Sequence, residues 1–312
     1  MRKPPAPPAI PNEPIFARLL PQLRSLVLNS VSSPITRALY RKALDDFLAW
    51  WEDKGRPPFQ RVTVQAHRTH LQKLGYSPST INQRLAALKK LAAEAAANGF
   101  FPMEAAAAIR DVSGIRQRGT RAGNWLTQAQ AQALLDAPDQ STTKGLRDRA
   151  LLALLLGCAL RRAEATSLTV DHLQHRDNRP VLIDLKGKHN RIRTVPVPLW
   201  VYQAIEAWRR EAHITEGPLL RAVNRHGVVS EKPLSAQAVR LVVAHYGRAI
   251  GIDHPLQAHD TRRTCAKLCR AAGADLEQIQ LLLGHASILT TESYLGTRQN
   301  LNDAPNDHLG IH

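Results

Sequence analysis

The chain has 312 residues and only three cysteines, Cys158, Cys265 and Cys269. They are too few and too irregularly spaced for a disulfide framework, and none belongs to a CxxC cluster of the kind that binds zinc. This scarcity indicates a reduced, intracellular setting. Cys265 and Cys269 lie one helical turn apart among alanines and leucines, so we expect them to pack in a core.

Hydrophobic runs long enough to cross a membrane are also missing. The apolar stretch from Arg149 to Leu160 is too short to span a bilayer and predicts a buried central helix. The N-terminus begins Met1-Arg-Lys and continues with prolines at positions 4, 5, 7, 8, 11 and 14, which is not the pattern of a signal peptide. We therefore expect residues 1–24 to form a flexible, proline-rich arm.

Acidic residues are scarce relative to basic ones. The chain has 42 Lys and Arg against 26 Asp and Glu, a formal net charge of +16. The part that ends at Asn124 has 19 basic and 8 acidic residues, and the remainder has 23 and 18. A surplus of this size attracts polyanions, so the composition predicts a nucleic acid as the partner.

The length favours two domains rather than one hydrophobic core. Ser33-Pro34 and Ser77-Pro78 each supply a helix start before an apolar pattern of helical period. Residues 25–111 are therefore predicted to form a helical domain, one face of which could contact phosphate. Three cations lie between the apolar positions of its second segment, where each could contact phosphate or belong to a solvated face: Arg84, Lys89 and Lys90.

A basic linker and a second domain are predicted to follow. Residues 112–124 contain three glycines and three arginines without periodicity, which is typical of a linker. Residues 125–312 are assigned to the second domain and its C-terminal tail. Thr127 and Gln130 have capping-box spacing, and the segments 181–185 and 193–197 predict a β-hairpin. The fold class is mainly α with a small β-sheet.

Several polar residues in the second domain could support chemistry. Arg161 and Glu164 are three residues apart, a spacing that suits an acid bracing a guanidinium but is commoner in structural salt bridges. His259 and Arg262 have the same spacing, and His285 follows a glycine. Tyr294 comes nine positions after His285. Singly, each histidine or tyrosine is more often a packing residue, so only their joint order favours a site.

The ordered series of Arg161, Lys188, His259, Arg262, His285 and Tyr294 resembles the active-site signature of the tyrosine recombinases, the phage integrase and Xer family. The stretch 282–294, Leu-Leu-Gly-His-Ala-Ser-Ile-Leu-Thr-Thr-Glu-Ser-Tyr, follows the family pattern almost throughout. The resemblance covers roughly residues 125 to 296. Three positions depart from it: Ala159, commonly glycine; Thr261, usually leucine; and Cys265, often aromatic.

The resemblance implies an N-terminal SAM-like core-binding domain followed by a mixed α/β catalytic domain. It implies that Tyr294 attacks a DNA phosphodiester, forming a 3′-phosphotyrosyl intermediate and a free 5′ hydroxyl. Arg161 and Arg262 suit a phosphate clamp because their planar groups offer several donors. His259 is expected to take or orient the tyrosine proton, and His285 to hydrogen-bond the phosphate.

The remaining roles are assigned as follows. Lys188 is the expected general acid, with Lys186 as the alternative because the hairpin register is not fixed by sequence. Glu164 and Asp260 are expected to be supporting residues. No cofactor, ATP or metal ion is expected.

The expected partner is double-stranded DNA with a specific recombination site, bound by a homotetramer in a prokaryotic cytoplasm, with accessory directionality proteins possible and no membrane association. The biological task, whether integration, excision or resolution, stays open. A type IB topoisomerase-like enzyme and a catalytically inactive DNA-binding relative are the alternatives.

Overall fold

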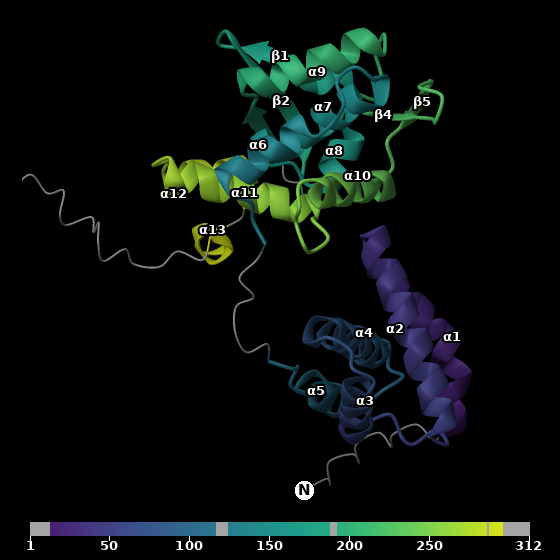
Figure 1. The fold of residues 1–312 in the computed structure, drawn as a ribbon. Helices are drawn as coiled ribbons and strands as arrows, with labels where there is room; N and C mark the ends of the chain where they lie inside the picture. Colours follow the sequence, from purple (N-terminus) through teal and green to yellow (C-terminus); the bar gives the residue numbers. More distant parts are fainter. Residues whose placement is uncertain (1–12, 117–123, 188–191, 286, 296–312) are drawn as a thin grey trace, which may run out of the picture. The chain divides into compact units, whose positions relative to one another are not determined.

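The computed structural model describes residues 13–116, 124–187, 192–285 and 287–295 (Figure 1). The chain divides into two compact units, Met1–Thr120 and Arg121–His312. Its described part is mostly helical with a small β-sheet, which confirms the predicted fold class. No helix in these described ranges has the length and apolar character that a membrane span requires.

In its described residues, the first unit consists of helices joined by short loops and has no β-strand. Its elements are α1 (Glu13–Asn29), α2 (Pro34–Asp53), α3 (Arg61–Lys73), α4 (Pro78–Ala97) and α5 (Met103–Arg110). Ser33 and Ser77 accept hydrogen bonds from the backbone N–H groups at the starts of α2 and α4, so both predicted helix starts are confirmed. Helix α4 contributes the largest share of buried residues and contacts all four other helices.

Helix α1 corrects the prediction of a flexible arm over residues 1–24. Residues 13–24 are helical, and residues 1–12 lie outside the described part. Pro14 falls in the first turn, where its missing N–H costs no helical bond, but Pro21 lies inside the helix. Leu23 and Val27 are completely buried in the core of the first unit, so tertiary packing outweighs the cost of Pro21.

The beginning of the predicted linker is held by the first unit. Val112 is fully buried, and Asn82 exchanges two hydrogen bonds with the backbone of Ile115, at 2.7 and 3.0 Å. Arg68 donates to the Ser113 carbonyl at 2.8 Å. Residues 112–115 are therefore anchored, and residues 117–123 lie outside the described part.

The second unit opens with helices around the predicted central helix. Thr127 and Gln130 form the predicted capping box before α6 (Gln128–Asp136). The apolar stretch belongs to α7 (Thr143–Gly157), whose residues 150–156 are all buried. A short turn leads to α8 (Arg162–Ser167) and η1 (Val170–His172).

The sheet of the second unit has the order β1-β2-β3, with antiparallel neighbours: β1 (Leu173–Arg176), β2 (Arg179–Lys186) and β3 (Ile192–Pro196). Leu182 of β2 pairs with Leu173 on one side and Val195 on the other. The predicted hairpin is therefore confirmed as β2–β3. Strand β1 was not predicted, and neither was the ribbon of β4 (Arg221–Val223) and β5 (Val229–Pro233).

Four further helices complete the described second unit after α9 (Leu199–Glu211), which packs on α7: α10 (Ala236–Ala249), α11 (Ala258–Ala271), α12 (Leu276–Leu283) and α13 (Ile288–Leu295). Helix α11 contacts α6, α7, α10, α12 and α13. This central position lets one helix bring polar residues from distant parts of the unit together.

Candidate active site

Arg161 stands at the turn between α7 and α8. Its backbone N–H donates to Glu164 Oε2 at 2.7 Å, and its guanidinium donates to Glu164 Oε1 at 2.7 Å. The structure thus contains the contact that the three-residue spacing suggested, although Arg161 is the N-cap of α8 rather than a residue within the helix. Ala159 in the same turn has φ of 49°, a left-handed conformation that favours the glycine it replaces in the family pattern.

Arg193 of β3 is a third arginine at this site and was missed as a site residue. It donates to both carboxylate oxygens of Glu164, at 2.7 and 2.9 Å, and its side chain is only 9% exposed. Burial favours the neutral form of Glu164, but the hydrogen bonds and charge of Arg193 and Arg161 outweigh it and lower the pKa of Glu164 to about 2. Glu164 therefore remains an anion that orients two cations.

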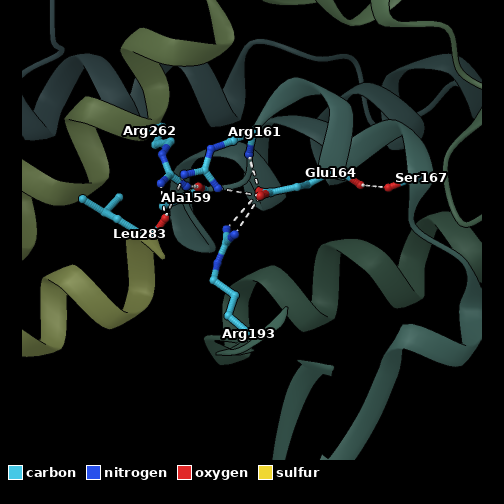
Figure 2. A network of polar contacts seen from close by, with 7 residues as sticks. All are labelled: Ala159, Arg161, Glu164, Ser167, Arg193, Arg262 and Leu283. Atoms are coloured by element: carbon cyan, nitrogen blue, oxygen red, sulfur yellow. Dashed lines mark hydrogen bonds and ion pairs between the residues drawn. The ribbon is translucent and has the colours of Figure 1, made fainter. Parts of the chain in front are cut away.

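Arg262 of α11 is linked to Arg161 by the backbone carbonyl of Leu283, which accepts from both side chains. Its guanidinium donates to the carbonyl oxygens of Ala159 and Leu283. Arg161 donates to the same Leu283 carbonyl at 3.3 Å. Figure 2 shows the three guanidinium groups converging on Glu164 and the Leu283 carbonyl from separate parts of the unit. The end of α12 thus fixes the relative positions of Arg161 and Arg262.

Gly284 explains how Arg193 can approach the end of α12. Gly284 has φ of 59°, and a Cβ there would lie 2.9 Å from Arg193 Cδ. Any larger residue would both strain the backbone and press on Arg193. The glycine of the Leu-Gly-His motif therefore leaves room for the arginine that braces Glu164.

The two histidines occupy an electropositive environment. Burial, followed by the charges of Arg262 and Arg161, lowers the pKa of His285 to about 4. Burial and the neighbouring Arg263 and Arg262 also lower the pKa of His259. Both imidazoles are therefore neutral at pH 7, so each ring has one N–H donor and one acceptor nitrogen. His285 Nδ1 lies 3.0 Å from the Thr291 hydroxyl of α13.

Cationic side chains line a pocket of about 360 Å³ beside this network. The lining includes Arg161, Arg162, Arg240, His259 and Arg262. Positive groups held in advance around a cavity bind an oxyanion and stabilise additional negative charge that develops on it. The pocket can therefore hold a phosphate group.

The other expected site residues are placed as follows. The Asp260 carboxylate accepts from the Gln257 N–H at 2.9 Å and so caps α11. Lys186 is the exposed last residue of β2, whereas Lys188 lies outside the described residues. Tyr294 belongs to α13, but its side chain is not among those described. Within the described residues, no group of three or more His, Cys, Asp or Glu could hold a metal ion.

Both units match protein families that are defined on phage integrases. Residues 124–300 match the phage integrase family, and residues 23–99 match the phage integrase N-terminal SAM-like domain. The chain is 30% identical to a tyrosine recombinase of Synechococcus elongatus over 91% of each sequence. It is also 30% identical to the tyrosine recombinase XerD of Pseudomonas putida, over 87% of this chain and 90% of that one.

Solved structures share the fold at lower sequence identity. The XerH site-specific recombinase bound to its palindromic difH substrate in a post-cleavage complex has a TM-score of 0.71 and 18% identity, over 90% of this chain and 80% of that one. A Tn1549 transposon integrase in complex with a circular intermediate DNA has a TM-score of 0.66 and 16% identity, over 92% of this chain and 98% of that one.

Proposed function

The chain belongs to the phage integrase family of tyrosine recombinases, and from that membership we propose that Tyr294 cleaves DNA through a 3′-phosphotyrosyl intermediate. The protein is a site-specific DNA recombinase, an enzyme that transfers DNA strands. The observation that supports the assignment of the site is the convergence of Arg161, Arg262 and His259 on one pocket, beside His285.

The arginines would act as the phosphate clamp. Attack on a phosphodiester places extra negative charge on the non-bridging oxygens in the transition state. Arg161 and Arg262 offer planar sets of donors that match these oxygens, and the shared Leu283 carbonyl holds them in register. Glu164 would support the clamp by orienting Arg161, and Asp260 by capping the helix that carries Arg262.

Tyr294 is the proposed nucleophile. It lies on α13 three residues after Thr291, whose hydroxyl contacts His285, so the helix that carries it contacts a histidine of the proposed site. A phenol is mostly protonated at neutral pH and needs a base or a cationic field. Neutral His259 would take or orient this proton, and His285 would hydrogen-bond the phosphate.

The departing 5′ oxygen needs a proton, which we assign to Lys188 with Lys186 as the alternative. The phosphotyrosyl linkage keeps the energy of the broken bond, so a second strand can attack it in reverse without ATP. The proposed partner is double-stranded DNA that carries a specific recombination site, bound by a homotetramer on the prokaryotic nucleoid. Accessory proteins that set the direction of the reaction are part of this proposal, which leaves the task open among integration, excision and resolution.

Covalent trapping tests the proposed nucleophile. Genomic fragments captured covalently by the protein would identify its site, and a nicked suicide duplex carrying that site would then trap the intermediate. We expect an adduct with a free 5′ hydroxyl, lost in Tyr294→Phe and kept in Tyr202→Phe, which alters another tyrosine of the second unit. An adduct that survives in Tyr294→Phe would refute the assignment.

The same substrate separates the alternatives. Products joined from two duplexes are expected of a recombinase, whereas relaxation of supercoils without joined products would indicate a topoisomerase-like enzyme. Site-specific binding without any adduct would indicate an inactive DNA-binding relative.

A further inference from the structure

A second pocket in the catalytic unit contains two thiols. It has a volume of about 520 Å³ and shares no lining residue with the phosphate pocket. Its lining combines apolar side chains, two glutamines and Arg149 with Cys265 and Cys269. The residues come from α6, α7 and α11 and from the start of α9. A cavity of this size is large enough for a small molecule.

The two thiols have unequal environments. Cys265 is only 7% exposed, and its Sγ lies 4.0 Å from the Gly157 carbonyl oxygen, whereas Cys269 is half-buried. The Cys265 thiol donates to that carbonyl and also interacts with the thiol of Cys269, one helical turn away. This interaction, together with burial, raises the pKa of Cys265, and the same interaction lowers the pKa of Cys269 to about 7. Cys269 thus has thiolate character.

Helix geometry disfavours a disulfide between these two cysteines. Residues four apart on a helix have Cβ atoms about 5–6 Å apart. A disulfide needs about 3.5–4.5 Å between its Cβ atoms, so closing one here would distort α11. A reactive sulfur at Cys269 would therefore find its partner in the pocket rather than in Cys265.

We propose that Cys269 is a modification site, at which a low-molecular-weight disulfide held in this pocket forms a mixed disulfide with the protein. The Cys269 thiolate attacks one sulfur of the small disulfide, and a new S–S bond forms as the old one breaks. The electron pair leaves with the second sulfur as a thiolate, which takes a proton from water. Cys265 remains reduced, with its S–H directed to the Gly157 carbonyl.

The test uses the full, reduced chain incubated with oxidised glutathione at pH 7, followed by intact mass measurement and peptide mapping. We expect one adduct, on Cys269, that dithiothreitol removes. Cys158, which is fully buried, serves as the internal control. Cys158→Ser should leave adduct formation unchanged, and Cys269→Ser should abolish it. Because this readout involves no DNA, its failure would not affect the proposed recombination chemistry.

The role of Cys265 has its own control. Cys265→Ala removes the neighbouring thiol that lowers the pKa of Cys269, so we expect the adduct on Cys269 to form about three- to tenfold more slowly at pH 7, as this pKa returns toward that of a free cysteine. Equal reaction at all three cysteines, or a rate on Cys269 that Cys265→Ala leaves unchanged, would overturn the proposal. Circular dichroism of each variant would establish that it is folded.

Discussion

Two arginines share both carboxylate oxygens of Glu164, and this makes Arg193 a positioning residue for Arg161. Arg193 contacts both oxygens of Glu164, and Arg161 is bound by the same carboxylate through its backbone and its guanidinium. If Arg193 were removed, Glu164 would have a single cationic partner and its orientation would be less constrained. Arg161 would then be held less accurately against the phosphate.

Arg193→Met should lower the rate of DNA cleavage by about 10- to 100-fold, as is common when an outer partner of a site residue is lost. The pKa of Glu164 should rise, because Arg193 is a main cause of its low value of about 2. Glu164 would then become protonated at higher pH, so the acidic limb of the cleavage profile should move upward. Single-turnover cleavage of the suicide duplex between pH 4 and 8 would measure both effects.

Arg176→Met is the matched control, since it removes one exposed cation from β1 of the same sheet. It should leave the acidic limb unchanged. Arg193→Met also leaves a buried carboxylate with fewer partners, a change that can cost about 3–5 kcal/mol of stability. A purely structural role would lower the amount of folded protein but would not shift the limb, so an unshifted limb contradicts the positioning role.

Residue-scale prediction succeeded where spacing along the chain is informative. The contact of Arg161 with Glu164 follows from three residues of separation. The contact of Glu164 with Arg193 spans 29 residues, and the Leu283 carbonyl that binds both clamp arginines lies farther still along the chain. Such contacts depend on how β3 and α12 pack on α8, so no local pattern predicts them.

His67 gives the packing of α2 against α3 a dependence on pH. The side chain is 1% exposed, and neither ring nitrogen has a hydrogen-bond partner. Its ring packs against Phe47 and Trp50 of α2, with centroids 5.0 and 4.8 Å away. Burial, with smaller contributions from His70 and Arg84 and against the charge of Asp46, lowers the pKa of His67 to about 4.

Acidification should therefore destabilise the first unit. The unfolded chain binds a proton at His67 below about pH 6.5, whereas the folded chain binds it only below about 4. The contribution of neutral His67 to the free energy of unfolding is fully present above the pKa of the unfolded chain and is lost as pH falls toward 4. The loss amounts to about 3 kcal/mol in total. Hydrogen exchange of peptides from α2 and α3, corrected for the intrinsic pH dependence, would report the free energy of opening.

His67→Leu should remove the contribution of His67 to the slope of stability against pH. It should leave stability at pH 7 nearly unchanged or higher, because no hydrogen bond is lost. His175→Gln, at an exposed position of β1, is the control and should keep the slope. A slope that persists in His67→Leu would place the acid sensitivity elsewhere.

Element-scale prediction followed the strength of the local signals. Ser33, Ser77 and Thr127 cap helices as predicted, and the β2–β3 hairpin has the apolar strands expected of it. Strand β1 was missed because its sequence, Leu-Gln-His-Arg, has no apolar alternation and is ordered by pairing with β2. Helix α1 was missed because the run of prolines that ends at Pro14 predicted an extended arm, whereas burial against α4 stabilises a helix.

At the scale of the whole molecule, each unit has its own hydrophobic core. Among the described residues, the core of the first unit draws its buried members from Leu23 to Val112. The clusters of the second unit draw theirs from Leu126 to Leu295. Since no buried cluster of these residues mixes the two sets, each unit contains the apolar contacts it needs to fold alone. Length and linker composition predict two domains.

The two units, produced separately as residues 1–120 and 121–312, should each unfold cooperatively and differ in their response to salt. The first has 18 basic and 8 acidic residues, and the second has 24 and 18. Fluorescence anisotropy on a duplex of arbitrary sequence would give both affinities. With about six phosphate contacts, the affinity of the first unit should fall about 1,000-fold between about 50 and 200 mM salt.

The second unit should show a shallower dependence, because its smaller surplus of charge would displace fewer counterions. A matched pair of changes that each remove one positive charge, Lys89→Gln and Lys144→Gln, would sharpen the comparison within the full chain. Lys89 lies on α4 of the first unit and Lys144 on α7 of the second. If the basic surplus of the first unit binds DNA, Lys89→Gln should lower the slope of log affinity against log salt concentration by about one, and Lys144→Gln should lower it by less. Equal slopes for the two units would contradict the assignment of general DNA binding to the first, because counterion release counts the phosphates that each surface neutralises.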